Sequence, residues 1–141
     1  MSDLSETIRA RGHEHVSAEH KSTLELTSDG WLTPAGDCIL AIEADRTPAG
    51  FADEFKQACA HADARIQITL EADGHMETIV GRGDPALTFE GDRSAVVRTS
   101  DYVDDRTVAV GTDKAAADLD RDLVAALSNG AVLTATLTVE R

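Results

Sequence analysis

The segment ETIRARG at residues 6–12 recurs as ETIVGRG at residues 77–83, 71 positions further along the chain. Other matches follow: Thr27-Ser28-Asp29 returns as Thr99-Ser100-Asp101, and Asp37 and Asp45 return as Asp105 and Asp113. Self-similarity at a fixed spacing indicates a repeated structural unit. We therefore interpret residues 1–141 as a single domain made of two copies of one unit, repeat one over about 6–74 and repeat two over about 77–140.

Each copy predicts the same order of elements: three strands, a helix and a fourth strand. In the first copy, Leu24 and Leu26 end an apolar alternation that predicts a strand over 13–27. Residues 37–44 are apolar at both parities, which predicts a central strand buried on both faces. Thr47-Pro48 is a typical helix start. The remaining predicted strands of this copy are 5–10 and 65–72.

Asp73-Gly74 predicts a hairpin turn into the second copy. There we expect strands over 76–82, 87–99, 106–110 and 131–139, and a helix over 115–128 that is capped by Thr112 or Asp113 and followed by a left-handed Gly130. The pattern predicts an α+β fold with a pseudo-twofold axis and two helices on a largely antiparallel mixed sheet. The alternative is a pseudo-symmetric β-barrel with two helices.

The chain is strongly acidic, with a formal net charge of -13 at pH 7. Aspartate dominates the acidic residues and arginine the basic ones, a bias typical of proteins from salt-loving archaea. At molar salt the Debye length falls to about 3 Å, so this charge does not exclude a nucleic-acid partner. Cys38 and Cys59 form no CxxC pattern and fit a reduced cytoplasmic compartment. No apolar run approaches the roughly 20 residues of a membrane-spanning helix.

Several runs of sequence carry a family resemblance: RGH at 11–13, HKSTLELT at 20–27 and LTPAGDCI at 32–39, with VRTSD at 97–101 and DRT at 105–107 in the second half. They resemble an archaeal family known as domain of unknown function 371. The resemblance extends over nearly the whole chain, from about Glu6 onward. It implies an archaeal, cytoplasmic, single-domain protein, haloarchaeal by its composition, and it implies no particular activity.

Five residues of metal-binding type occur close together in the sequence: His13, His15, His20, Asp37 and Cys38. Imidazole, carboxylate and thiolate groups all bind divalent transition metals. A strand would place His13 and His15 on one face and His20 on the other. The metal hypothesis therefore rests on His13, His15 and Cys38. In the competing interpretation, the histidines are solvated and Cys38 is a small buried residue.

Asp37 and Asp105 open equivalent predicted strands. Their carboxylates either accept hydrogen bonds from turn N–H groups or meet across the pseudo-twofold axis, where proximity would raise the pKa of one of them. In the second arrangement the catalytic candidates of a hydrolase are His13, His20, Asp37 and Asp105.

Arg11 and Arg82 occupy equivalent positions, and Arg106 stands where the first copy has Cys38. Guanidinium groups bind phosphate and carboxylate with two hydrogen bonds. These three arginines are therefore the candidate residues for binding a small anionic ligand.

Three functions follow from these candidates. We expect first a non-catalytic module that binds a small anionic ligand or a protein partner at the seam between the repeats. The second is a metal- or acid-base-dependent hydrolase. The third is an RNA-associated protein that uses Arg11, Lys21, Arg82 and Arg93, with Trp31 or Tyr102 for base stacking. The sequence leaves open whether the protein is an enzyme and which oligomeric state it adopts.

Overall fold

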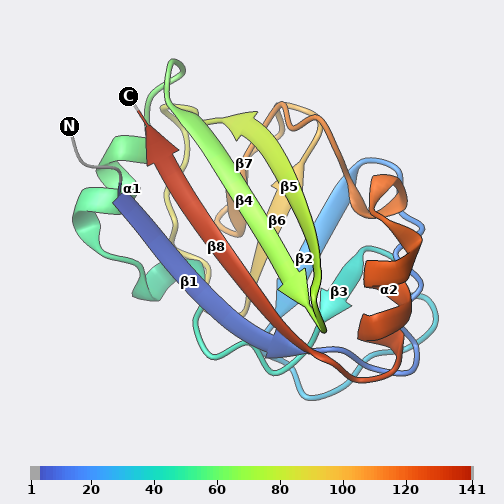
Figure 1. Ribbon diagram of the computed structural model, residues 1–141. Helices are drawn as coiled ribbons and strands as arrows, with labels where there is room; N and C mark the ends of the chain where they lie inside the picture. The colour runs from blue at the N-terminus through green and yellow to red at the C-terminus, as the bar shows by residue number, and fades with distance from the viewer. Residues whose placement is uncertain (1–3, 141) are drawn as a thin grey trace.

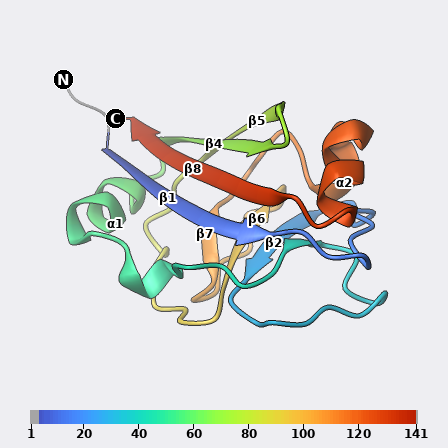
Figure 2. The same cartoon turned by 60° about the horizontal axis from the view of Figure 1, so that its bottom comes forward.

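Two four-stranded β-sheets face each other in the computed structural model, which describes residues 4–140 (Figures 1 and 2). Sheet A is antiparallel throughout, with the order β1 (Leu4–Arg11), β8 (Val132–Glu140), β4 (Arg65–Ala72), β5 (His75–Arg82). Sheet B has the order β3 (Ile39–Ala41), β2 (Thr23–Thr27), β6 (Ser94–Arg98), β7 (Thr107–Ala109). Its two central strands are antiparallel, and each outer strand runs parallel to its neighbour.

Two helical segments lie at opposite ends of the paired sheets (Figure 1). Each consists of a 3-10 turn followed by an α-helix: η1 (Pro48–Gly50) with α1 (Asp53–Cys59), and η2 (Ala116–Asp118) with α2 (Arg121–Ser128). Thr47 precedes η1 but makes no capping hydrogen bond through its side chain. Asp120, rather than Thr112 or Asp113, caps α2, because its carboxylate accepts the N–H of Asp122 at 2.7 Å.

The prediction of an α+β fold with two helices is confirmed, although the strands divide into two sheets instead of one. The alternative of a closed β-barrel is wrong. The edges of the two sheets approach each other at two isolated bridges, one between Arg11 and Ile42 and the other between Arg82 and Val110. Each helix connects a strand of sheet B to a strand of sheet A.

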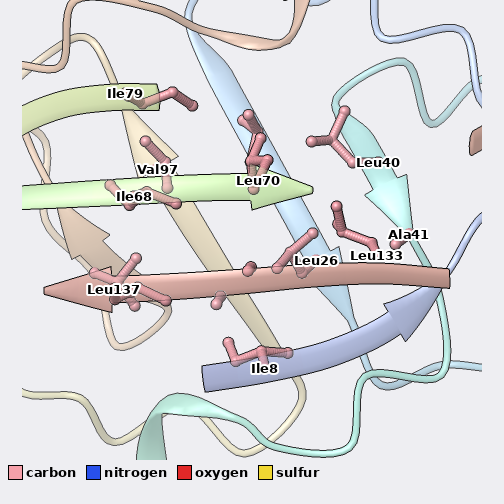
Figure 3. Close-up of a cluster of buried hydrophobic side chains, with 14 of the residues drawn as sticks. Ile8, Leu26, Leu40, Ala41, Ile68, Leu70, Ile79, Val97, Leu133 and Leu137 are labelled. Atoms are coloured by element: carbon pink, nitrogen blue, oxygen red, sulfur yellow. The ribbon is translucent and has the colours of Figure 1, made fainter. Parts of the chain in front are cut away.

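The core lies between the two sheets, where alternate residues of each strand meet (Figure 3). Ile66, Ile68, Leu70 and Ala72 of β4 are buried as their alternation predicts, and β8 follows the same pattern. The turn at Asp73-Gly74 has left-handed φ values of 52° and 81°, and Gly130 has φ 87°, so both predicted turn conformations are confirmed.

The predicted strand over 13–27 is wrong in its first part, since β2 begins only at Thr23. The chain turns at His13, whose carbonyl accepts the N–H of Val16 at 3.0 Å, and Ala18 has a left-handed φ of 50°. Val16 and Ala18 are nevertheless buried. They continue the apolar alternation of β2 without belonging to a strand, because a loop also covers the core. In the second copy, only Ser94–Arg98 of the predicted strand over 87–99 is a strand, namely β6.

The segment predicted as a central strand over 37–44 is also different in the structure. Only Ile39–Ala41 is a strand, and it lies at the edge of sheet B. Leu40, Ala41 and Ile42 are fully buried all the same. Helix α2 packs against β3, so this edge strand is covered on the side that would otherwise face solvent.

The residues that recur in the sequence make equivalent contacts in the two halves. Glu6 accepts the backbone N–H of Ala52 at the start of α1 at 2.6 Å and pairs with Arg46. Glu77 accepts the N–H of Asp120 at the start of α2 at 2.7 Å and pairs with Lys114. Both carboxylates thus bind the N-terminal end of a helix, where negative charge is favoured.

The glycines of the repeated RG pair allow each half to touch the helix of the other half. A Cβ atom on Gly12 would lie closer than 3.0 Å to the carbonyl oxygen of Leu127 in α2. A Cβ atom on Gly83 would lie equally close to the carbonyl oxygen of Cys59 in α1. Backbone N–H groups of the same two glycines bond to Ala131 and Ala64, just before β8 and β4. Only glycine fits at these two positions.

We predict that Gly12→Ala and Gly83→Ala each lower the free energy of unfolding by about 3 kcal/mol, because the added methyl group collides with backbone that cannot yield cheaply. Urea unfolding followed by circular dichroism measures this loss. Gly50→Ala is the control, since a Cβ atom there meets nothing within 4 Å. Equal stability of all three variants would contradict the packing argument.

Candidate functional site

The histidines of the predicted metal site support their own loop. The Nδ1 atom of His20 accepts the backbone N–H of Ser22 at 3.2 Å and of Thr23 at 3.1 Å. The Nδ1 atom of His13 accepts the N–H of His15 at 3.0 Å, and the two rings lie 5.1 Å apart. Among residues 4–140, no three His, Cys, Asp or Glu side chains lie close enough to hold one metal ion. The structure therefore does not bring His13, His15 and Cys38 together.

Asp37 and Asp105 lie far apart. They precede β3 and β7, which are the two opposite edges of sheet B. Three strand spacings separate these edges, about 14 Å in total. The backbone carbonyl of Asp37 accepts the N–H groups of Glu19 and His20, and that of Asp105 accepts the N–H of Gly91. Both residues fasten a preceding loop, and their carboxylates do not form a pair.

Cys38 and Arg106 both approach the same carboxylate oxygen of Glu25, a residue of β2. The thiol of Cys38 donates to the Glu25 carboxylate at 3.7 Å, and Arg106 approaches the same carboxylate at 3.9 Å. Burial, together with the neighbouring Glu25 charge, raises the pKa of the Cys38 thiol. Cys38 is therefore a hydrogen-bond donor here, and its thiolate form is disfavoured.

Besides approaching Glu25, Arg106 forms a salt bridge with Asp104. Its Nη2 atom lies 2.9 Å from the Asp104 carboxylate, which the buried Arg98 also contacts at 3.0 Å. Burial would raise the pKa of Asp104, but hydrogen bonds from Arg106 and Thr107 outweigh it and lower this pKa to about 2. Arg98, Asp104 and Arg106 together hold β6 against the loop before β7, so the two arginines stabilise the fold.

Arg11 and Arg82 lie at the ends of β1 and β5, the two outer strands of sheet A. They do not meet at one axis. Arg11 binds Glu43 through two hydrogen bonds, whereas Arg82 approaches Asp84 at 3.9 Å. Arg93 of the predicted RNA-binding stripe pairs with Asp29 at 2.7 Å. These three arginines each have an acidic partner, so they form no free basic stripe.

One surface hollow includes two predicted site residues, Arg11 and His13. We call it the seam groove. It separates residues 11–14, which lead out of β1, from residues 128–130 at the end of α2, and its volume is about 490 Å³. It is lined by Arg11, Gly12, His13, Glu14, Ser128, Asn129 and Gly130. One wall comes from the first half of the chain and the other wall from the second half, because Gly12 packs directly on α2.

Arg11 also lines a shallower hollow with Arg9, Ala10 and Glu43, which adjoins the seam groove. The space between the two sheets, in contrast, offers no ligand site. Its cavity is lined entirely by apolar side chains and has a volume of about 10 Å³, which is no more than one water molecule occupies. Any ligand at the seam must bind at the surface.

The seam groove offers hydrogen-bond donors on its first wall. Glu43 occupies the Nε and one Nη2 hydrogen of Arg11, at 2.8 and 3.0 Å, and the Nη1 hydrogens make no hydrogen bond within residues 4–140. Because Nδ1 of His13 is an acceptor, the neutral ring carries its proton on Nε2. The hydrogen bond and charge of Glu43 raise the pKa of Arg11, so this guanidinium stays charged.

Sequence reasoning identified Arg11 and His13 but missed Glu43. Its backbone has φ 55°, a left-handed conformation that costs a residue with a side chain roughly 1 kcal/mol. The position 68 residues later, where the two halves match, is Gly111 with φ 57°. The sequence signal for Glu43 was that the matching position of the second half, 68 residues later, is a glycine.

The fold is that of a small α+β protein with two facing sheets and a surface groove where the N-terminal and C-terminal halves of the chain meet. A family model described as Domain of unknown function (DUF371) matches residues 8–140, so the chain belongs to this family. It is 39% identical over 123 residues to Uncharacterized protein MJ0206 of Methanocaldococcus jannaschii, which spans 87% of this chain and 90% of that protein. None of the helices within residues 4–140 has the length and apolar character needed to cross a membrane.

We predict that Asp104→Asn lowers the free energy of unfolding at pH 7 by about 2 kcal/mol, the amount linked to a pKa of about 2 against an ordinary 3.8. The folded-state pKa is depressed, so this stabilisation is present above pH 4 and disappears as the pH falls through 2. Urea unfolding at pH 7, 4 and 2 tests the prediction, with Asp101→Asn in the same loop as the control. A difference from the wild type that stayed constant with pH would contradict it.

Proposed function

We propose that this protein is a non-catalytic binding module that takes a small anionic ligand in the seam groove. The observation that carries the proposal is that Arg11 lines both the seam groove and the adjoining hollow, while one edge of its guanidinium makes no hydrogen bond within residues 4–140. A guanidinium that is held along one edge can present its other edge to two oxygens of a phosphate or carboxylate.

Further donors support an anion. The Nε2–H of the neutral His13 ring belongs to the same wall, and the exposed Arg9 lines the adjoining hollow. The side chain of Arg9 makes no hydrogen bond or ion pair to another residue within 4–140, although its backbone N–H bonds to Asp45. Across the two hollows Arg9 and Arg11 balance Glu14 and Glu43, so in a chain with a net charge of -13 this region is locally neutral.

The hydrolase alternative finds less support in the geometry. It requires His13 or His20 to face Asp37 with a free ring nitrogen. His20 lies next to Asp37 through its backbone N–H, but its Nδ1 atom already accepts hydrogen bonds from residues 22 and 23 of its own loop. A base that is occupied in this way has no free nitrogen at Nδ1 for a substrate proton.

We expect inorganic phosphate to bind the wild type in the millimolar range and Arg11→Gln about tenfold or more weakly, because a charge-assisted hydrogen-bond pair is lost. Titration followed by ¹H–¹⁵N NMR at constant ionic strength measures the affinity and locates it through the amides of residues 11–14 and 128–130. Sulfate and acetate serve as further probes of the same groove.

The control is Arg65→Gln, which breaks a comparable surface pair. Arg65 lies 3.5 Å from Glu140, and both side chains are about as exposed as those of Arg11 and Glu43. This variant should bind phosphate as the wild type does. The proposal fails if none of the three anions shifts the groove amides of the wild type, or if both arginine variants weaken binding equally.

A further inference from the structure

Glu43 has a backbone conformation that its side chain disfavours. It follows Ile42, which forms the isolated bridge with Arg11, and its φ is 55°. In the other half, Val110 forms the same bridge with Arg82, and the next residue is Gly111 with φ 57°. The turn after this bridge therefore requires a left-handed residue, for which glycine is the unstrained choice. At Glu43 the chain carries a side chain in spite of the strain.

The side chain at this position holds Arg11. Oε1 of Glu43 accepts from Nε at 2.8 Å, and Oε2 accepts from Nη2 at 3.0 Å. This two-point contact fixes the plane of the guanidinium as well as its position. It uses the side edge of the group, so the end edge, formed by Nη1 and the second Nη2 hydrogen, stays available.

Arg82 is the same residue type at the matching position, but its acidic partner, Asp84, lies 3.9 Å away and does not hold it through two hydrogen bonds. Its Nη1 atom donates to the carbonyl of the adjacent Gly83 at 3.3 Å, and its Nε lies only 3.2 Å from where a Cβ atom of Gly111 would be. The arginine thus folds back over the glycine. Arg11, which Glu43 holds, lines two surface hollows, one of them the seam groove.

We propose that Glu43 is a positioning residue, which holds the Arg11 guanidinium so that its end edge can bind two oxygens of an anion; this inference rests on the proposed function of the seam groove. A purely stabilising salt bridge is a poor explanation for the strain. The two side chains are 52% and 47% exposed, and ion pairs at that exposure add little to stability.

The test compares Glu43→Gly and Glu43→Gln with the wild type in three measurements. The solvent exchange rate of the Arg11 Nε–H, observed by ¹⁵N NMR, should rise about tenfold in Glu43→Gly, because its acceptor is gone. The dissociation constant for inorganic phosphate should rise about fivefold in both variants, since the guanidinium is no longer held in place. The urea midpoint of Glu43→Gly should be unchanged or higher, as glycine relieves the left-handed strain.

Glu140→Gln is the matched control, because it removes the acidic partner of Arg65 at similar exposure. It should change neither phosphate affinity nor Arg11 exchange. A lower urea midpoint in Glu43→Gly with unchanged phosphate affinity would overturn the inference and make the pair a structural salt bridge.

The inference and the proposed function can fail separately. If the wild type binds no anion, the proposed function fails, and the exchange rate then decides the role of Glu43. Slow exchange of the Arg11 Nε–H that is lost in Glu43→Gly would still support a positioning role. Fast exchange in the wild type would refute it.

Discussion

The arrangement of this protein depends on two close contacts between glycine and helix. Gly12 touches the last turn of α2, and Gly83 touches that of α1, at distances that leave no room for a Cβ atom. Each contact joins one half of the chain to the helix of the other half, so the ends of β1 and β5 are held against α2 and α1. The seam groove is a result of this packing. Gly12 brings residues 11–14 to residues 128–130, and a hollow remains where the two backbones separate again.

Much of the fold could be predicted because its long strands are regular. In β4 and β8 every second residue is apolar and buried, and such alternation is typical of a β-strand with one buried face. The matching halves then gave the order of the elements. The division into two sheets could not be predicted, since β2 and β3 are short and the buried residues Val16, Ala18 and Leu40 to Ile42 belong partly to loops. Burial beneath loops and helices produces the same apolar pattern as a strand.

The site was less accessible to sequence reasoning, because residue type does not reveal which partner a side chain has. Asp37, Asp105 and His20 have suitable chemistry, yet each fastens a loop through its backbone or ring nitrogen. Arg11 and Arg82 are indistinguishable in the sequence motif. They differ in the residue that follows the bridging isoleucine or valine, Glu43 or Gly111. Arg11 agrees between the matching halves whereas His13 and Glu43 differ, so neither agreement nor difference alone marks the residues around the groove.

The pairing of β1 with β8 has a consequence for how the chain acquires its structure. Leu4 lies opposite Val139, so β1 cannot pair with β8 until nearly all of residues 4–140 have been synthesised. Closing this pair joins almost the whole chain into a loop, and such long-range contacts slow folding. Until β8 has been synthesised, β4 has β5 on one side but lacks β8 on the other, so one edge of β4 has no partner strand. We therefore expect folding to be completed only once β8 has left the ribosome and can pair with β1 and β4.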